Sequence, residues 1–413
     1  MRISSVTTLR LREYPNLCYF ALATDDGLTG IGETYFGARA VAAWVHETGA
    51  AYLLGKDPRT IELHSRSLEG FVGSAGTGTE NRGRSAVDIA LWDLLGRRSG
   101  LPLYQLIGGL TRESVPVYNT CAGPTYVREL PGSPDLPVSN WSSRRQAPGG
   151  AGRSDLEWFL TDAGSLAKDL LAEGITGMKI WPFDEYAERT GGQHISDADL
   201  ERGLEPFRQV RETTGSEVAV IAELHSKWNL PSALKIARAL EPYQPLWVED
   251  PLRMDSLDAL ARFCAEVPFP TGASETVGSA RMFKGLIEHA GVQVVLFDPA
   301  WAGGITEAVK IAALADAQHL PVAVHDCTGP VNFAVGVHLS CSLGNAFVQE
   351  SVRAFYRGWY RELVTELPHV EAGNVAPLHG PGIGCELVED LWRREDAIVE
   401  SSSLEEGAGP LSS

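Results

Sequence analysis

The chain has little of what marks several large protein classes. Its six cysteines form no CxxC pair, which argues against a redox motif or a disulfide framework. No apolar run approaches the roughly 18 residues of a spanning helix, and the first residues carry no apolar signal-like core. Basic residues are few, with 35 Lys and Arg against 53 Asp and Glu and a net charge of −18. We therefore expect a cytoplasmic protein that binds neither nucleic acid nor membrane.

The first part of the chain carries patterns of strands followed by helices. Residues 1–35 alternate in the manner of an antiparallel meander, with a turn at Asp25, Asp26 and Gly27. Residues 85–100 have helical spacing and end at a glycine followed by a proline. With 44% hydrophobic residues, the 413-residue chain can fill one large core or two. These patterns predict an α+β domain over residues 1–115.

From about residue 116 the rhythm changes. Short apolar runs alternate with longer amphipathic segments up to about residue 355, which is typical of a (β/α) barrel. Parallel barrel strands are buried on both sides and should read as continuous apolar runs, as these do. The eight runs are VPVYN, GMKIW, VAVIAE, LWVED, PTGASE, VVLFD, PVAVH and AFVQE.

Two segments interrupt this pattern. Residues 128–153 are rich in Pro, Gly and Ser and follow the first barrel strand, so we interpret them as a lid over the barrel mouth. Such a lid would carry Arg144 toward an anionic substrate, and a disordered insertion is the alternative. Residues 401–413 are small and polar, and we expect a disordered tail there.

Polar side chains gather where the barrel runs end. Glu223, Glu249 and Glu275 follow three successive runs at intervals of 26 residues, one β/α unit each. Adjacent strands therefore present three carboxylates to one point on the barrel rim, where they would repel one another without a cation. Oxygen ligands with positions left over favour Mg²⁺ over Zn²⁺.

Other strand ends supply further candidates for chemistry. They are Lys179, His225, Asp298, His325 and Glu350. Asp298 precedes His325 by one barrel unit, so its carboxylate is placed to bond the imidazole and to fix its tautomer and basicity. A single residue of this kind is often structural, but one at every successive strand end indicates an active site.

The order Lys, three Glu, Asp, His and Glu at strand ends resembles the enolase superfamily in its mandelate racemase-like branch. The stretches WVEDP (247–251), GIGE (30–33) and GPGIG (380–384) are similar to that branch as well. The resemblance implies a modified (β/α)7β barrel under an N-terminal α+β capping domain, to which residues 356–400 return. It also implies that Mg²⁺ holds a substrate carboxylate while a base removes the α-proton to give an enediolate.

The resemblance assigns roles residue by residue. It makes Glu223, Glu249 and Glu275 the metal ligands, His325 with Asp298 the base, and Glu350 a contact of the substrate carboxylate or the enediolate. Two departures stand out: Glu223 replaces the usual Asp, and the Lys-x-Lys pair is reduced to Lys179 followed by Ile180 and Trp181. Without the second lysine, Lys179 is a poor base and is instead a candidate partner of the substrate carboxylate.

His225 lies two residues after the first ligand, which resembles the galactonate- and mannonate-type dehydratases of the branch. There such a histidine protonates the leaving hydroxyl. The sequence thus predicts a Mg²⁺-dependent hydro-lyase that converts an aldonic or aldaric sugar acid to a 2-keto-3-deoxy acid. Alternatives are a racemase or epimerase with Lys179 and His325 on opposite faces, a cycloisomerase, and a non-catalytic metal-binding regulator.

Residues that touch the rest of the substrate are expected in the cap and at the barrel mouth. The candidates are Tyr14, Asn16 and Tyr35, which we expect in loops of the cap, Trp181 after the second barrel strand, and Arg144. The segment 73–83 is a further candidate for specificity. The expected partner is a small carboxylate, and we expect a homo-oligomer. Which sugar acid binds is left open.

Overall fold

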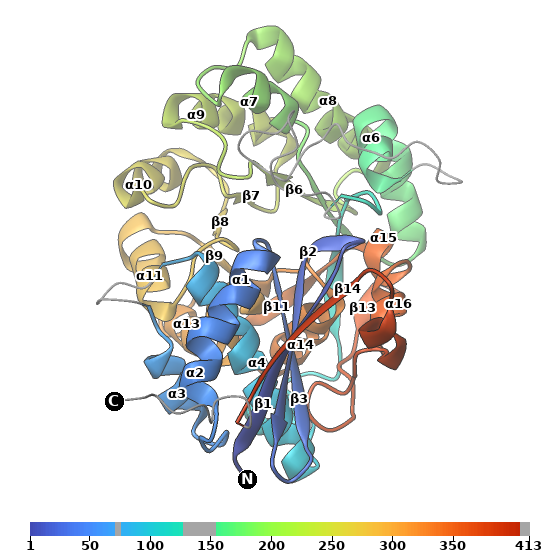
Figure 1. The fold of residues 1–413 in the computed structure, drawn as a ribbon. Helices are drawn as coiled ribbons and strands as arrows, with labels where there is room; N and C mark the ends of the chain where they lie inside the picture. The colour runs from blue at the N-terminus through green and yellow to red at the C-terminus, as the bar shows by residue number, and fades with distance from the viewer. Residues whose placement is uncertain (71–75, 127–153, 405–413) are drawn as a thin grey trace.

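A four-stranded antiparallel sheet joins segments from both ends of the chain. The computed structural model describes residues 1–70, 76–126 and 154–404, and it orders this sheet β14–β1–β2–β3. The strands are β1 (Ile3–Leu11), β2 (Tyr14–Thr24), β3 (Thr29–Tyr35) and β14 (Ala397–Ser403). The last strand lies antiparallel beside β1 (Figure 1). The tail expected from residue 401 is therefore wrong for 401–403, and 405–413 lie outside the described residues.

Helices pack on this sheet or on one another and complete the capping domain. They are α1 (Ala38–Trp44), η1 (Val45–Gly49), α2 (Ala50–Leu53), α3 (Ile61–Ser67), α4 (Thr79–Ser99) and α5 (Leu103–Leu106). The long helix α4 lies so close to β3 that a Cβ on Gly32 would meet the Ala86 carbonyl oxygen at 2.0 Å. The glycines of the GIGE motif therefore allow close packing of the helix on the sheet.

Eight parallel strands form a closed barrel, because β11 also pairs with β4. They are β4 (Val115–Thr120), β5 (Gly177–Ile180), β6 (Ala219–Glu223), β7 (Val248–Glu249), β8 (Thr271–Ala273), β9 (Val294–Phe297), β10 (Val322–Val324) and β11 (Ala346–Ser351). Each lies within or overlaps one of the eight predicted runs. The predicted α/β class, a barrel with an α+β cap, is confirmed.

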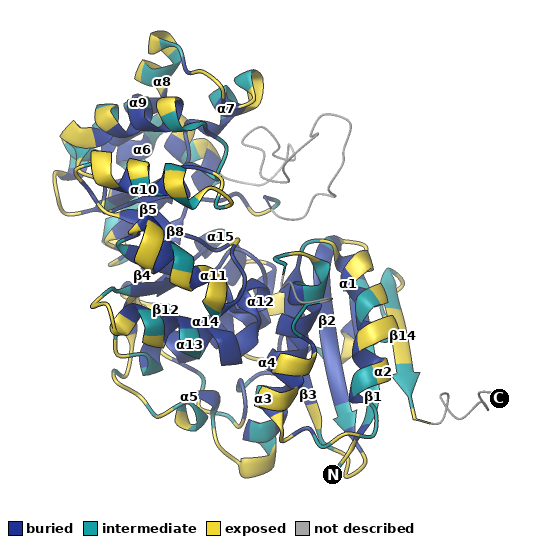
Figure 2. Cartoon of the chain, turned by 90° about the vertical axis from the view of Figure 1, so that its left-hand side faces the viewer, coloured by how far each residue is buried: buried dark blue, intermediate teal, exposed yellow. Residues whose placement is uncertain are grey.

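The barrel helices surround the strands. They are α6 (Asp155–Ala172), α7 (Asp184–Thr190), α8 (Asp197–Thr214), α9 (Leu230–Leu240), η2 (Glu241–Tyr243), α10 (Leu257–Glu266), α11 (Ala280–Gly285), η3 (Leu286–Ala290), α12 (Pro299–Ala302), α13 (Gly304–Asp316), α14 (Pro330–Ser342), α15 (Arg353–Tyr356) and α16 (Tyr360–Leu363). The outer helices, such as α6, α8 and α10, bury one side and expose the other, whereas α12 and α14 are almost fully buried (Figure 2). Within the described residues, no helix is long and apolar enough to cross a membrane. The predicted lid, 128–153 with Arg144, lies outside them.

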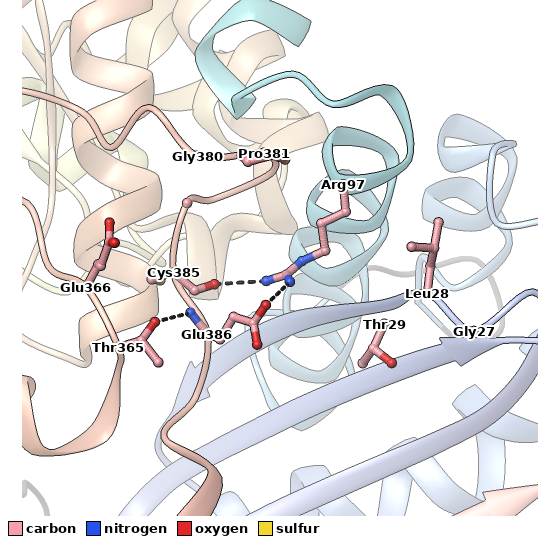
Figure 3. Close-up of a pocket in the computed structure, with 11 residues that line it drawn as sticks. Gly27, Leu28, Thr29, Arg97, Thr365, Glu366, Gly380, Pro381, Cys385 and Glu386 are labelled. Atoms are coloured by element: carbon pink, nitrogen blue, oxygen red, sulfur yellow. Dashed lines mark hydrogen bonds and ion pairs between the residues drawn. The ribbon is translucent and has the colours of Figure 1, made fainter.

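The segment after the barrel runs back to the cap. It contains the short strands β12 (Val370–Glu371) and β13 (Asn374–Val375), the 3-10 helix η4 (Glu389–Arg393), and finally β14. Arg97 at the end of α4 holds this segment by donating to the Cys385 carbonyl and to Glu386 (Figure 3). The hollow in Figure 3 thus lies between the β2–β3 turn and the returning chain.

The cap meets the barrel along α4, which packs against α12 and α13. Gly304 has a φ of +86°, and a Cβ there would meet Asp88 of α4 at 2.3 Å. The Asp88 carboxylate accepts a hydrogen bond from the Thr306 amide at 2.9 Å. A glycine is therefore needed at this contact for backbone conformation and for space.

Candidate active site

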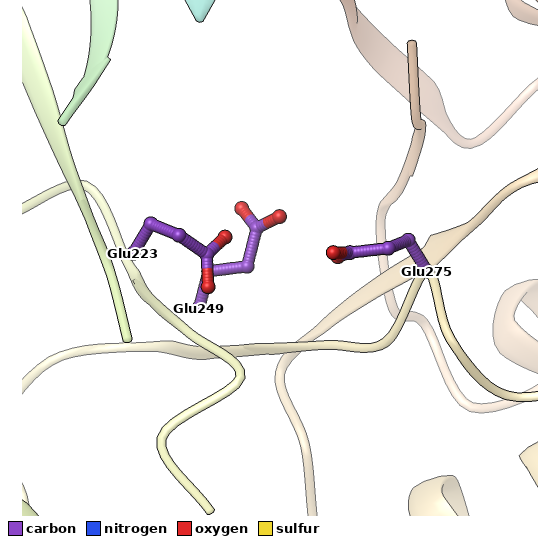
Figure 4. Close-up of side chains that lie close together, drawn as sticks. All are labelled: Glu223, Glu249 and Glu275. Carbon is purple, nitrogen blue, oxygen red and sulfur yellow. The ribbon is translucent and has the colours of Figure 1, made fainter. Parts of the chain in front are cut away.

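Three glutamates from adjacent barrel strands lie together at the carboxyl ends of those strands. Glu223 and Glu249 end β6 and β7 and are paired in register, and Glu275 follows β8 by two residues. One carboxylate oxygen from each lies within 4.8 Å of the others, and all three side chains are buried. Figure 4 shows Glu275 pointing toward the other two.

This cluster fits a divalent cation. The Glu223 Oε2 and Glu275 Oε2 atoms are buried and accept no hydrogen bond. Burial and the neighbouring carboxylates raise the pKa of Glu223 well above its ordinary value, and burial raises the pKa of Glu275. Buried acceptors that repel one another and lack donors are the donor set that a hard cation satisfies.

Lys179, the last but one residue of β5, lies against these carboxylates. Its Nζ is 2.7 Å from Glu249, 2.8 Å from Glu350 and 3.6 Å from Glu223. Burial alone would lower the pKa of Lys179, but Glu249 and Glu350 outweigh burial and hold it well above the ordinary value. The ring beneath its ammonium group is Tyr118, at 5.9 Å. Lys179 is thus a cation held among acids.

His325 follows β10 and is held by Asp298, which follows β9. Their Nδ1 and Oδ2 atoms are 2.6 Å apart, and both side chains are buried. Burial lowers the pKa of His325, but Glu350 and Asp298 raise it, to about 10. Asp298 in turn accepts from the Asn332 amide group at 3.0 Å and from the Ala300 amide at 2.7 Å. The imidazole is therefore fixed through Nδ1, which leaves Nε2 for chemistry.

Glu350, at the end of β11, joins the lysine to the histidine. Its Oε1 accepts from Lys179 and from the Thr120 hydroxyl. Its Oε2 accepts from the Asp326 amide at 3.2 Å and lies 3.9 Å from His325 Nε2. Lys179, Glu350 and the His325–Asp298 pair are thus connected.

His225 is held in the same manner as His325, by an acid that the sequence analysis missed. Its Nδ1 is 2.8 Å from Asp184 Oδ2, and Asp184 also binds Lys227 at 2.6 Å. Burial opposes ionisation of Asp184, but Lys227 and His225 hold its pKa below the ordinary value. The His225 backbone has a φ of +49°, and its amide donates to Glu223 Oε1 at 2.6 Å. The histidine therefore sits beside the acidic cluster.

The structure corrects the expected setting of the substrate-contact candidates. Tyr14 and Asn16 lie in β2 and Tyr35 ends β3, so their placement in loops is wrong, and all three are buried. Asn16 donates to the Tyr35 hydroxyl at 3.1 Å. Trp181 is buried 5.6 Å from the His225 ring in an edge-on contact. Trp181 therefore lies beside the His225 imidazole.

Sequence reasoning missed Asp184, Asn332 and Thr120. Asp184 had a signal, since it lies five residues after Lys179 and begins the helix α7 that follows β5. Asn332 links the base to the cap, because its backbone amide donates to Glu33 of the GIGE motif at 3.0 Å while its side chain holds Asp298. Nothing in the local sequence shows that link, because it joins residues about 300 positions apart.

Comparisons with known proteins agree with this geometry. Residues 5–108 match the N-terminal domain of mandelate racemase and muconate lactonizing enzyme, and residues 162–391 match the enolase C-terminal domain-like family. The D-galactonate dehydratase of Ralstonia nicotianae is 29% identical over 402 residues, covering 95% of this chain and 93% of that protein. The D-galactonate dehydratase of Xanthomonas oryzae pv. oryzae is 28% identical over 405 residues, covering 95% and 94%.

Solved structures give the same result. An enolase of the mandelate racemase subgroup from Agrobacterium tumefaciens, with a succinimide residue, is 42% identical with a TM-score of 0.85, covering 98% of this chain and 99% of that one. An enolase from environmental sequencing of the Sargasso Sea is 38% identical with a TM-score of 0.85, covering 97% and 99%. The chain therefore belongs to the enolase superfamily, in its mandelate racemase-like branch, and is an enzyme of that group.

Proposed function

We propose that the protein is a Mg²⁺-dependent hydro-lyase that removes water from a sugar acid and yields a 2-keto-3-deoxy acid. The observation that carries this is the pair of imidazole–carboxylate dyads, His325–Asp298 and His225–Asp184, at one acidic cluster. The His225 amide donates to Glu223, and His325 Nε2 lies 3.9 Å from Glu350, which supports the two histidines facing the same space. Relatives named D-galactonate dehydratase support the same reaction class.

Glu223, Glu249 and Glu275 would hold the Mg²⁺ ion, which when bound supplies positive charge against the substrate carboxylate and the developing enediolate. His325 accepts the proton from C2 at its Nε2, while Asp298 keeps the imidazole oriented. His225 donates a proton from Nε2 to the hydroxyl that leaves C3, so one water is released and the enol product becomes the 2-keto acid. Two placed imidazoles thus serve the two proton transfers of a β-elimination.

Lys179 fits a charge-balancing role better than a base. Its ammonium group is surrounded by Glu249, Glu350 and Glu223. His325, by contrast, is held through Nδ1 by Asp298 and directs Nε2 away from that contact. The racemase alternative, which needs Lys179 opposite His325, is therefore supported less well. The substrate is a small carboxylate, and the expected homo-oligomer stays a prediction.

The test is an NMR screen of aldonic and aldaric acids in D₂O with Mg²⁺, starting with galactonate. A new 3-deoxy signal that carries deuterium would establish dehydration and name the substrate. Exchange of the α-proton without a deoxy product would favour the racemase. Metal binding without exchange for any acid would favour the non-catalytic regulator.

A further inference from the structure

Arg82, in the first turn of α4, occupies an unusual position between the cap and the barrel. Its guanidinium carbon lies 4.7 Å from the centre of a Trp301 ring and 5.4 Å from that of Phe36. The Nη1 atom donates to the Tyr35 carbonyl at 2.5 Å, and the Trp301 indole donates to the same carbonyl at 3.2 Å. The guanidinium plane is therefore held by rings and one carbonyl, and within residues 1–70, 76–126 and 154–404 only one of its five donors is used.

No described carboxylate forms an ion pair with Arg82. Its neighbours on α4 differ, since Arg84 pairs with Glu307 at 3.1 Å and Arg97 with Asp93 at 2.7 Å. Burial lowers the pKa of Arg82 to about 10, while the charge of Asp298 acts in the opposite direction. The Arg82 side chain is half-buried, and a cation with no counterion among the described residues is a candidate partner for an anion from solution.

The position of Arg82 relative to the base, His325, indicates which kind of anion would bind it. The Trp301 ring that carries the guanidinium lies 5.3 Å from the His325 ring, so one aromatic side chain separates Arg82 from the base. Asn81, next to Arg82, holds the Trp301 carbonyl at 2.5 Å, which fixes this arrangement. Two other described cations near the glutamate cluster are already paired: Lys179 with three glutamates, and Lys227 with Asp184 and Glu188.

We propose that Arg82 binds the second carboxylate of a dicarboxylic sugar acid, so that the substrate class is aldaric rather than aldonic. This rests on the proposed dehydratase function. One carboxylate of the substrate lies at the glutamate cluster, and the carbon chain of the substrate then spans the mouth to the guanidinium. The planar fork of Arg82 matches a carboxylate in two parallel hydrogen bonds, and the rings beneath it prevent its withdrawal into water. An aldonic acid offers only a hydroxyl there.

The experiment compares galactarate with galactonate, which share the configuration at the reacting carbons and differ at the far end. We expect wild-type kcat/KM to favour galactarate. We expect Arg82→Gln to lower kcat/KM for galactarate by about 100-fold and for galactonate by a much smaller factor, since a charged hydrogen-bonded pair is lost only with the former. Arg82→Lys, which keeps the charge without the fork, should fall between. Arg98→Gln is the control, because Arg98 makes an exposed ion pair with Asp26 at the other end of α4.

Two results would overturn the assignment: a wild-type enzyme that prefers galactonate, or an Arg82→Gln variant that loses both activities by the same factor, as a purely structural role would require. If neither acid is turned over, the proposed function fails. Calorimetric titration of the two acids in the presence of Mg²⁺ still decides whether Arg82 binds the second carboxylate. Binding of galactarate that Arg82→Gln weakens selectively supports the assignment, and binding that is insensitive to the change contradicts it.

Discussion

Each of the two histidines at the mouth holds a buried carboxylate at Nδ1, so the function of the imidazole depends on a second residue. For His225 that residue is Asp184, at 2.8 Å. The two proton transfers of the proposed reaction are separable, because α-proton exchange needs the base alone. A change at the His225 dyad should therefore affect elimination and spare exchange.

We predict that Asp184→Asn lowers kcat for dehydration by about 100-fold and leaves α-proton exchange in D₂O largely intact, because the amide no longer fixes the tautomer of His225. His225→Asn should show the same split, more strongly, while His325→Asn should lose both reactions. The measurement is NMR of exchange and product in the same tube.

Asp197→Asn serves as the control for Asp184, since Asp197 is an exposed first-turn acid that pairs with Lys235. Equal loss of exchange and elimination in Asp184→Asn would mean that Asp184 only supports the fold of the β5–α7 loop.

At the scale of single residues, spacing along the sequence located the three glutamates and the base His325, but not the side chains that hold the two histidines. Glu223, Glu249 and Glu275 come together because parallel strands end at one edge, and strand ends can be read from apolar runs. Asp184 meets His225 because the His225 backbone adopts a left-handed conformation at φ +49°, which no local pattern indicates. Tyr14 was misplaced because β2 begins earlier than its apolar run.

Among the elements, α14 joins the barrel to the returning C-terminal segment. His338 on this helix lies 2.9 Å from the Ile383 carbonyl through Nε2 and is fully buried. Burial lowers its pKa to about 4, so the folded protein excludes a proton that the unfolded chain binds below its ordinary pKa of 6.5. The stability contributed by neutral His338 is present above pH 6.5 and is lost as the pH falls toward 4.

We predict that wild type loses up to about 3 kcal/mol of unfolding free energy from this group between pH 7 and pH 4. In His338→Gln, which keeps an N–H donor but does not titrate, the acid-side decline should be smaller by that amount. Urea unfolding followed by tryptophan fluorescence at several pH values measures the difference. Parallel pH curves for the two proteins would exclude His338 as a source of acid sensitivity.

The contact between α4 of the cap and α13 of the barrel gives a second prediction about stability. Gly304→Ala places a Cβ against Asp88 and forces a side chain onto a backbone at φ +86°. We expect a loss of about 2–3 kcal/mol in the free energy of unfolding. Gly344→Ala, where an added Cβ meets nothing within 4 Å, should change it little. Equal Tm values for the two variants would show that the cap moves away from the barrel at no cost.

Most elements were predictable and their contacts were not. The eight barrel runs were identifiable because buried parallel strands are apolar on both sides, as β9 is throughout. The helix α4 begins at Thr79, earlier than its clear periodicity, since its first turns pack on α12 rather than on the cap sheet alone. Arg82 lies in those turns, so its setting could be found only in three dimensions.

For the whole molecule, an excess of 18 negative charges coexists with a buried cluster of three glutamates. The barrel and cap order followed from the sequence because a βα rhythm leaves few alternatives. The repulsion energy within the cluster could not be predicted from the sequence, since it depends on how closely the carboxylates approach one another. At oxygen separations within 4.8 Å they repel, and Lys179 balances only part of their charge.

The final prediction follows from that repulsion. The effect of Glu223→Gln on the free energy of unfolding should have opposite signs with and without Mg²⁺. Mg²⁺ at 100 times its Kd should stabilise wild type by about 2.7 kcal/mol, because the ion binds only the folded cluster. Glu223→Gln should lose this gain and all turnover. Without Mg²⁺ the same variant should be at least as stable as wild type, since an acid no longer has to be buried or protonated among other carboxylates, and the amide oxygen still accepts from the His225 amide. Denaturant unfolding with MgCl₂ or NaCl at equal ionic strength separates the two effects.

Equal Mg²⁺ stabilisation of wild type and Glu223→Gln would place the ion elsewhere on this acidic protein. If the variant is the more stable protein without Mg²⁺ and wild type becomes the more stable one as Mg²⁺ is added, the ion binds at Glu223.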